Sequence, residues 1–334
     1  MSVTKEVQDS RDGQLQKFSD RITAATSDQL FEILSTVFAC SIIVTIALTV
    51  VILGRGSLLV FEQFGFGFVT GVNWNAIVGK ESYGILPYIL GTLVTSGIAI
   101  GIGIPISLGI AIFLAEMAPN RIRAPLSQLV ELLAAVPSVV YGLWGLFVLR
   151  FWIANYVEAP LSTSLGFLPI FQGAPNGLDL LMGGVILSIM IIPTISAISR
   201  DVMSAVPSSQ REAAYSIGAT RWEVVRIGVL SYARSGIFGA AILGLGRAVG
   251  ETMAVTMVIG NSTGVGALPV SLFRSGQTMA SLIANEFNEA EAGSLQQSAL
   301  IGVGFMLFLI ALLINMFAQL MVWRVLKVKG GAVE

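Results

Sequence analysis

The chain has 334 residues, of which 54% are hydrophobic and only 12% are charged, and its mean hydropathy is +0.82. Few soluble domains are this apolar, so the composition argues against an ordinary soluble protein and favours one that lies in a membrane. The absence of histidine argues against imidazole-based metal or acid–base chemistry, and the single cysteine, Cys40, excludes an intrachain disulfide.

Residues 1–30 are polar and of mixed charge, and they show no signal-peptide pattern. We therefore expect a cytosolic N-terminal tail here, followed by an apolar segment that is retained as an anchor. Residues 31–87 are expected to hold this first transmembrane helix and an outside loop. Residues 88–325 are expected to form the main transmembrane domain, and residues 326–334 a cytosolic tail.

Apolar segments of about 20 residues mark transmembrane helices, and the sequence contains six of them. They are residues 33–53, 88–114, 133–153, 181–199, 233–259 and 299–323. The sequence thus predicts an all-α, polytopic membrane protein with six transmembrane helices. Pro105, Pro137 and Pro193 are predicted to lie inside the second, third and fourth helices, where each removes a backbone hydrogen bond.

Basic residues are concentrated on one side of the predicted spans, and this side is expected to be cytosolic by the positive-inside rule. They are Lys5, Arg11, Lys17, Arg21, Arg121, Arg123, Arg200, Arg211, Arg221, Arg226, Arg234, Arg324, Lys327 and Lys329. The loops on the other side carry few basic residues. Both termini are therefore predicted to be cytoplasmic.

Two predicted outside loops, residues 54–87 and 260–298, are longer than usual connections. The second contains SLIANEFNEAEAGSLQQ, residues 281–297, which is predicted to form a short surface helix. Two interpretations remain open for these loops. They are either a contact surface for an extracytoplasmic partner or a solvated cap over the helix bundle.

A charged segment lies between the fourth and fifth predicted spans. Ser209 and Glu212 have capping-box spacing, as do Thr220 and Glu223, and Gly218 lies where a helix can end in a left-handed residue. The pattern predicts a helix, a glycine turn and a second helix that dock a soluble partner. The alternative is an ordinary basic inter-span loop. A DNA-binding helix-turn-helix is disfavoured by the flanking spans, so we expect no nucleic-acid partner.

The fifth predicted span contains Arg247 and Glu251, which are four residues apart and so share one face of a continuous helix. A charge in mid-membrane costs from about 3 to over 10 kcal/mol unless it is paired or hydrated. Because a guanidinium offers a planar fork of donors and keeps its proton, the pattern favours an oxyanion pathway. Gly246 and Gly250 would leave room for the anion. The alternative is an internal ion pair that only holds two helices together.

The charged segment resembles the EAA loop of ABC-importer permeases, in which Glu-Ala-Ala is followed by three residues and Gly. The matching residues are Glu212, Ala213, Ala214 and Gly218, with Leu230 further on. The segment departs from the pattern at Gly228, where Ile is usual, and at Ser231, where Pro is usual. The resemblance implies an ABC importer type 1 permease fold. It also implies that a cytosolic coupling loop, about residues 206–231, docks on an ATPase.

Three further segments are similar to permease subunits of bacterial phosphate-specific ABC importers. They are ELLAAVPSVVYGLWGLF at 131–147, GLGRAVGETMAVTMVIGN at 244–261 and ANEFNEAEAG at 284–293. The resemblance implies that Arg247 and Glu251 match a functionally important charged pair on a phosphate pathway. It implies a multi-pass protein of the bacterial plasma (inner) membrane.

The same resemblance implies a complex with four kinds of partner. They are a homologous second permease of the PstA type, two cytosolic ATPase subunits of the PstB type, an extracytoplasmic phosphate-binding protein of the PstS type, and the lipid bilayer. The chain lacks the GxxxxGK[ST] sequence of a nucleotide-binding loop. We therefore expect a transport subunit that is not an enzyme, has no cofactor or metal, and relies on a separate ATPase.

Two other functions remain open. The first is an ABC permease for another oxyanion, such as sulfate or molybdate, or the sister phosphate permease. The second is a secondary transporter or channel that needs no ATPase, although the inverted repeats typical of such transporters are not evident in the sequence.

Overall fold

The computed structural model describes the backbone of residues 3–325 and the side chains of residues 29–321. It is almost entirely helical, and its two strands, β1 (Trp74–Asn75) and β2 (Ser82–Tyr83), form a short antiparallel hairpin. Six segments of this described part are long and apolar enough to cross a membrane. The predicted all-α, six-span architecture is therefore confirmed.

The chain divides into two compact units, residues 1–55 and 56–334. The first unit lies almost wholly within helix α1 (Val3–Gly56), whose apolar part covers residues 29–56. Thr36, Thr45 and Thr49 donate their hydroxyl protons to the backbone carbonyl four residues earlier, at 2.8 Å. Because the helix satisfies these hydroxyls itself, they add little to the cost of placing α1 in lipid.

The second unit contains the other five spans, and in three of them the α-helix continues through wider π-helical turns. The second span joins α4 (Leu86–Ile112) to η1 (Phe113–Met117). The third joins α6 (Ser138–Trp144), η2 (Gly145–Leu149), α7 (Arg150–Ile153), η3 (Ala154–Glu158) and α8 (Ala159–Leu165). The fourth is α9 (Leu180–Ser204). The fifth joins α11 (Arg221–Glu223), η5 (Val224–Leu230) and α12 (Ser231–Gly250), and the sixth is α15 (Leu295–Val325).

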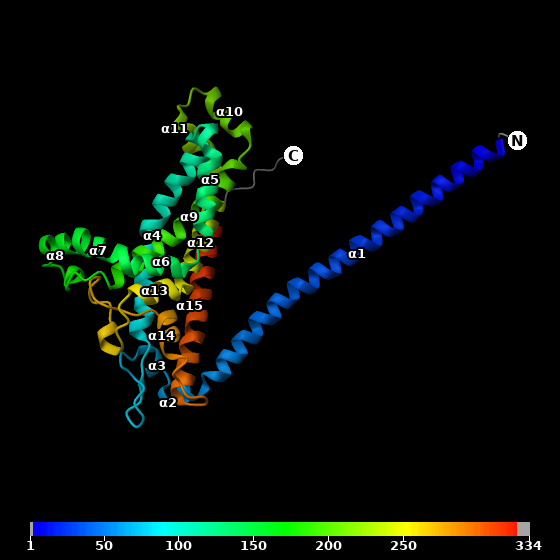
Figure 1. The fold of residues 1–334 in the computed structure, drawn as a ribbon. Coiled ribbons are helices and arrows are strands. Elements are labelled where there is room, and N and C mark those ends of the chain that lie inside the picture. Colours follow the sequence, from blue (N-terminus) through cyan, green and yellow to red (C-terminus); the bar gives the residue numbers. More distant parts are fainter. Residues whose placement is uncertain (1–2, 326–334) are drawn as a thin grey trace. The chain divides into compact units, whose positions relative to one another are not determined.

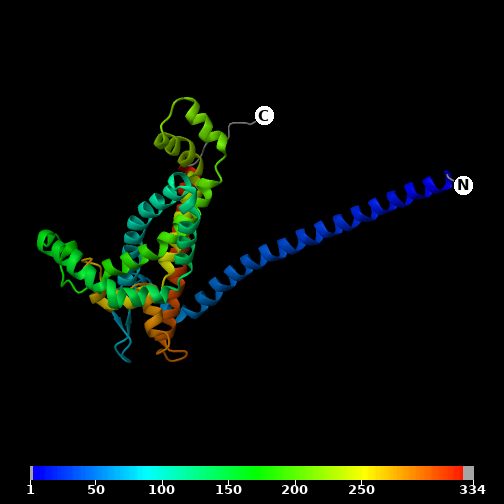
Figure 2. The same cartoon turned by 45° about the horizontal axis from the view of Figure 1, so that its top comes forward.

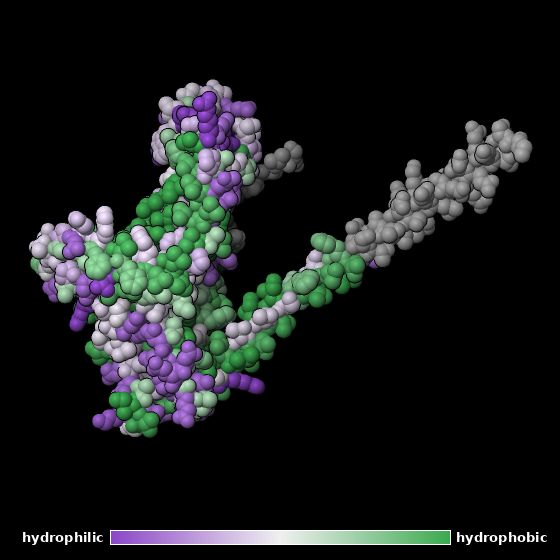
Figure 3. Space-filling view, in the orientation of Figure 1, coloured by the Kyte–Doolittle hydropathy of each residue, from purple (hydrophilic) through white to green (hydrophobic). Residues whose placement is uncertain are grey.

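Shorter elements lie between these spans. They are α2 (Leu58–Phe64), α3 (Gly67–Thr70), α5 (Asn120–Ala135), η4 (Pro169–Phe171), α10 (Ser208–Ser216), α13 (Met253–Val258), η6 (Gly264–Ala267) and α14 (Met279–Glu286). Figures 1 and 2 show α10 and α11 at one end of the second unit, and α2 and the hairpin at the opposite end. Figure 3 shows mostly hydrophobic residues directly below the α10 end of this unit, and a mixture of hydrophobic and hydrophilic residues towards the hairpin end.

Helix α9 forms the centre of the second unit. Leu187, Ile191 and Ile195 are buried in one apolar cluster with residues of α4 and α12. Gly103 of α4 faces Ile191, and Gly244 of α12 faces Ile195. A Cβ added at Gly244 would lie only 2.5 Å from Cδ1 of Ile195. The missing side chains therefore allow α4 and α12 to approach α9 closely, which is how helices pack in lipid.

Two of the three predicted helix interruptions by proline are confirmed. Pro105 lies inside α4 and Pro193 inside α9. The prediction for Pro137 is wrong, because this residue is the N-cap of α6 and the preceding Val136 is extended. Proline disfavours helical backbone at the residue before it. The chain therefore breaks into α5 and α6, and the third span runs over 138–165 instead of the predicted 133–153.

The two predicted outside loops pack against each other at the hairpin end. Trp74, Tyr83 and Tyr88 stack edge to face and form a buried cluster with Met279 and Leu282 of α14. The predicted helix within residues 281–297 is thus confirmed only in part, since α14 covers Met279–Glu286 and its first half is buried. The loops form a cap, whereas a contact with an extracytoplasmic partner remains a prediction.

Two buried carboxyl groups connect the third and fourth spans near the hairpin end. Glu158 and Asp179 are both fully buried, and the charge of Glu158 acts on Asp179. Glu158 also accepts the N–H of Gly177 at 3.0 Å, and Asp179 accepts the N–H of Met182 at 2.9 Å as the N-cap of α9. Burial and the neighbouring carboxylate both disfavour a charge on Asp179. Burial, with a smaller effect from the charge of Glu158, raises the pKa of Asp179 to about 8.

This raised pKa predicts that alkaline conditions destabilise the protein. Folded Asp179 keeps its proton up to about pH 8, whereas the unfolded chain loses it near pH 4, so stability should fall as the pH rises between these values. The slope should be at most about 1.4 kcal/mol per pH unit. Thermal unfolding of the detergent-solubilised protein from pH 5 to pH 9 measures it.

Glu158→Gln removes the neighbouring charge, which is the smaller cause of the raised pKa of Asp179, so this variant should lose part of the pH dependence while burial maintains the rest. Glu289→Gln changes an exposed carboxyl group and is the matched control, which should keep the wild-type slope. An unchanged slope in Glu158→Gln would contradict the assignment.

Candidate functional site

The predicted helix, glycine turn and second helix of the charged segment are confirmed. Helix α10 ends in a turn in which Gly218 has φ +82°, the N–H of Gly218 bonds the carbonyl of Tyr215, and the N–H of Ala219 bonds that of Ala214. This is the pattern of a Schellman C-cap. Thr220 and Glu223 then form the predicted capping box at the start of α11, with the Thr220 N–H to Glu223 Oε2 distance at 2.7 Å.

The other predicted capping box, Ser209 with Glu212, is wrong. Helix α10 begins at Ser208 with Pro207 as its N-cap, and Pro207 makes no side-chain cap. Proline lacks an N–H and has a fixed φ, so the helix can begin directly after it. Ser209 is therefore already inside the first turn, two positions after the N-cap.

The predicted coupling residues lie on different faces of this segment. Glu212 and Ala213 are exposed on α10, and Gly218 is exposed in the turn, whereas Ala214 is buried. Large apolar side chains that the sequence reasoning missed are also exposed here. They are Tyr215, Ile217 and Ile227, and Ile217 is 80% exposed. Exposed large apolar side chains are typical of a protein interface, and docking of a partner on this segment remains a prediction.

The two departures from the EAA pattern have a packing explanation. Gly228 lies in η5 where α10 packs on it, and a Cβ at this position would lie 3.2 Å from the carbonyl oxygen of Gln210. At Ser231, η5 passes directly into α12 with helical backbone. The helix that begins at Arg221 therefore continues into α12 without a break.

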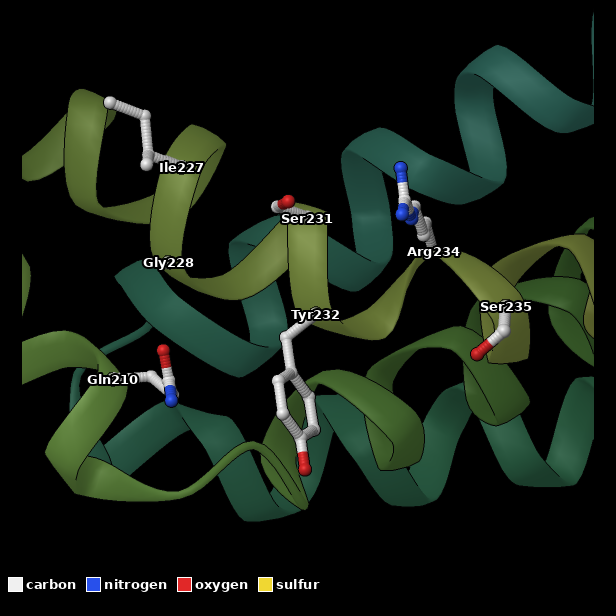
Figure 4. Close-up of a pocket in the computed structure, with 7 residues that line it drawn as sticks. All are labelled: Gln210, Ile227, Gly228, Ser231, Tyr232, Arg234 and Ser235. Carbon is white, nitrogen blue, oxygen red and sulfur yellow. The ribbon is translucent and has the colours of Figure 1, made fainter. Parts of the chain in front are cut away.

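A polar groove lies beside this continuous helix, with a volume of about 360 Å³. Its walls come from α10, η5 and the first turns of α12, as Figure 4 shows. The lining residues are Gln210, Ile227, Gly228, Ser231, Tyr232, Arg234 and Ser235. The groove therefore combines polar and aromatic side chains next to the docking helix.

Arg247 lies in α12, and its Nη1 donates to the Thr194 hydroxyl oxygen of α9 at 2.9 Å. It also interacts electrostatically with Tyr141 of α6. Both Arg247 and Thr194 are half-buried. The guanidinium thus joins α12 to α9, and its charge acts on Tyr141 of a third span. Sequence reasoning missed Thr194, although its position next to the helix-bending Pro193 marks a place where α9 is irregular.

The expectation that Arg247 and Glu251 share one helix face is wrong. Helix α12 ends at Gly250, Glu251 is extended, and its Oε1 accepts the N–H of Ala254 at 3.2 Å, at the start of α13. The carboxylate thus satisfies a first-turn N–H that would otherwise be unpaired in an apolar region. None of the ion pairs among side chains 29–321 joins Arg247 to Glu251. The space predicted beside this site is present, because a Cβ on Gly250 would meet nothing within 4 Å.

Comparison with known proteins places this architecture in a family. Residues 107–327, which include the docking segment and Arg247, match the family of binding-protein-dependent transport system inner membrane components. The chain belongs to this family. It is a multi-pass membrane protein and a permease subunit of an ABC transporter.

Three curated relatives are similar along most of their length. The phosphate transport system permease protein PstC of Haemophilus influenzae is 44% identical and covers 91% of this chain and 95% of its own. The PstC protein of Mesorhizobium japonicum is 43% identical, with 96% and 95% covered. The probable PstC protein of Methanocaldococcus jannaschii is 36% identical, with 85% and 91% covered.

Two solved structures share the fold at low sequence identity. An inward-facing MetNI methionine ABC transporter has a TM-score of 0.51 and 17% identity, and covers 72% of this chain and 95% of its own. A bacterial ABC transporter involved in alginate import has a TM-score of 0.52 and 17% identity, with 81% and 91% covered. The predicted type 1 permease fold is thereby confirmed.

The turn at Gly218 yields a prediction about docking. A Cβ here would meet nothing within 4 Å, so only the positive φ, +82°, restricts the residue. Gly218→Val should strain the turn and weaken docking, with loss of ATPase copurification at near-normal membrane abundance. Gly218→Asn is the control, since asparagine tolerates this conformation, and it should keep its ATPase. Full ATPase binding by Gly218→Val would contradict a role for this turn.

Proposed function

We propose that the chain is the membrane-spanning permease subunit of an ATP-driven importer that translocates inorganic phosphate into the cell. The observation that carries the proposal is the placement of Arg247. This guanidinium lies within a span, is half-buried, and donates a hydrogen bond to the uncharged hydroxyl of Thr194. The names of the curated relatives support phosphate as the substrate.

The chemistry of this position suits a tetrahedral oxyanion. Arg247 uses Nη1 on Thr194, which leaves further N–H donors of its fixed fork for a substrate. The Thr194 oxygen accepts from Arg247, so its own proton is available to an anion. Because Glu251 is directed to the start of α13, its charge does not neutralise the guanidinium. Arg247 is thus the proposed anion-binding group of the pathway, and Glu251 a pathway residue that shapes the helix break beside it.

The docking segment supports the proposed partners. Glu212 and Ala213 would contact a cytosolic ATPase, Ala214 would hold α10 against η5, and Gly218 would set the angle of the turn. Two ATPase subunits, a homologous second permease and an extracytoplasmic phosphate-binding protein complete the proposed complex. In it, ATP-driven closure of the ATPases moves the docking segment, and the spans open alternately outward and inward.

The topology follows from the same proposal. The docking segment, residues 206–231, would be cytosolic, as would both termini, in a bacterial plasma membrane. The cap formed at the hairpin end would then face the binding protein. The cytosolic tail over residues 326–334 and the basic residues Lys327 and Lys329 lie outside the described residues.

The pathway role of Arg247 predicts a transport defect without disassembly. Arg247→Gln keeps donors but loses the charge and the fork, and phosphate uptake should fall at least roughly tenfold, the scale of a lost charge-assisted hydrogen bond. Copurification of the ATPases should be normal. Arg247→Lys, which keeps the charge alone, should be intermediate.

The double variant Arg247→Gln with Glu251→Gln separates a pathway role from a structural one. It removes both charges from this apolar region, so an imbalance of buried charge cannot account for a transport defect. We expect it to assemble with its ATPases and still fail to import phosphate. Near-normal uptake would show that Arg247 is structural, and uptake of sulfate or molybdate in preference to phosphate would reassign the substrate.

A further inference from the structure

A second arginine, Arg211, connects the docking helix to two transmembrane spans. Its Nη2 lies 2.7 Å from Oε1 of Glu116, and its Nε lies 3.3 Å from Oε2 of the same carboxylate. Its Nη1 donates to the carbonyl of Val206 at 2.6 Å, and its Nη2 to that of Met203 at 3.0 Å. Arg211 belongs to α10, Glu116 to η1 at the end of the second span, and Met203 to the last turn of α9.

The geometry makes these contacts stronger than an ordinary surface ion pair. The Arg211 and Glu116 side chains are only 23% and 11% exposed. A bidentate, charge-assisted contact that is partly buried is poorly screened by salt. Met203 and Val206 carry carbonyls at the C-terminal end of α9, where a cation is favoured by the helix dipole. One guanidinium thus donates to a carboxylate and to the carbonyl of Val206, and it shares the carbonyl of Met203 with the N–H of Val206.

The other ion pairs near the C-terminal end of α9 are more exposed than the Arg211–Glu116 contact and do not involve α10. Arg200 pairs with Glu131 and Asp201, but these carboxylates are 56% and 66% exposed, and the contacts do not involve α10. Helix α10 otherwise packs through Ala214 and Gln210 on η5, which continues into α12. Among side chains 29–321, the Arg211–Glu116 contact is the only ion pair that joins α10 to a span.

We propose that Arg211 is the positioning residue that transmits movement of the docking helix, α10, to α4 and α9. It does so through its hydrogen bonds to Glu116 and to the carbonyls of Met203 and Val206. Packing on η5 connects α10 to α12, and Arg211 connects it to the other two central spans. The docking helix therefore moves the three central spans together. The proposal rests on the proposed function only in that an ATPase docks on α10.

The test measures movement of α4 and not transport. In a Cys40→Ser background, a single cysteine replaces Ile106, which lies in α4 and is 46% exposed. The full complex with its ATPases is reconstituted in nanodiscs, and the thiol labelling rate is compared without nucleotide and with vanadate-trapped ADP. We expect trapping to change the labelling rate in this otherwise wild-type complex. With Arg211→Gln added, ATPase copurification and vanadate trapping should persist, while the trapping-dependent change in labelling falls roughly tenfold.

Two further variants and one matched control complete the test. Glu116→Gln leaves the carbonyl bonds of Arg211 in place and should assemble even if Arg211→Gln does not, with a several-fold smaller labelling change than wild type. Arg211→Lys keeps the charge without the fork and should recover part of the change. Arg200→Gln is the matched control, and its change should equal that of wild type.

The outcomes separate this inference from the proposed function. A full labelling change in Arg211→Gln or in Glu116→Gln would overturn the positioning role, as would the absence of any change in the wild-type background, because α4 would then not follow the ATPases. Phosphate uptake by the wild-type complex in proteoliposomes is measured alongside. Failure of uptake with a normal, Arg211-dependent labelling change would overturn phosphate as the substrate and leave the positioning role supported.

Discussion

Backbone hydrogen bonding without water is the constraint on which most of this structure depends. A polar group in the hydrocarbon region must find its partner inside the protein, so the spans are helical and every interruption is repaired locally. At the break after Gly250, the Glu251 carboxylate accepts the N–H of Ala254. At the start of α9, Asp179 does the same for Met182. These two carboxylates in apolar surroundings thus accept backbone N–H groups, and each lies where a helix begins.

The spans could be predicted from the sequence because their signal is the sum of about 20 apolar residues, which no single side chain reverses. Their ends could not, because each depends on one residue. Pro137 was expected inside a helix, yet the backbone before it is extended and α6 begins after it. Gly250 ends α12 where the apolar run continues. Hydropathy reports the environment of a residue and carries no information on whether the backbone stays helical.

The candidate site likewise contains features that the sequence could predict and features that it could not. The turn at Gly218 and the Thr220–Glu223 box were predictable because their geometry is local, whereas the Ser209–Glu212 box failed because the helix starts directly after Pro207, two positions earlier than expected. Arg247 was identifiable from the cost of its charge. Its partner, Thr194, lies on another helix 53 residues away, and no local pattern specifies it. Contacts between helices in lipid depend on which small residues let the backbones approach, as Gly244 does opposite Ile195.

The absence of a break between η5 and α12 has a mechanical consequence. Arg221 and Arg247 lie on one uninterrupted helical segment, Arg221–Gly250. At about 1.5 Å per residue, this segment is roughly 35–40 Å long between the two arginines. A tilt of the whole segment by about 10° would displace one end by roughly 6–7 Å relative to the other. The usual proline at position 231 would place a flexible joint in this segment. With Ser231 there, the segment acts as a stiff lever, and a small rotation at the docking end becomes a displacement larger than the radius of an anion at Arg247.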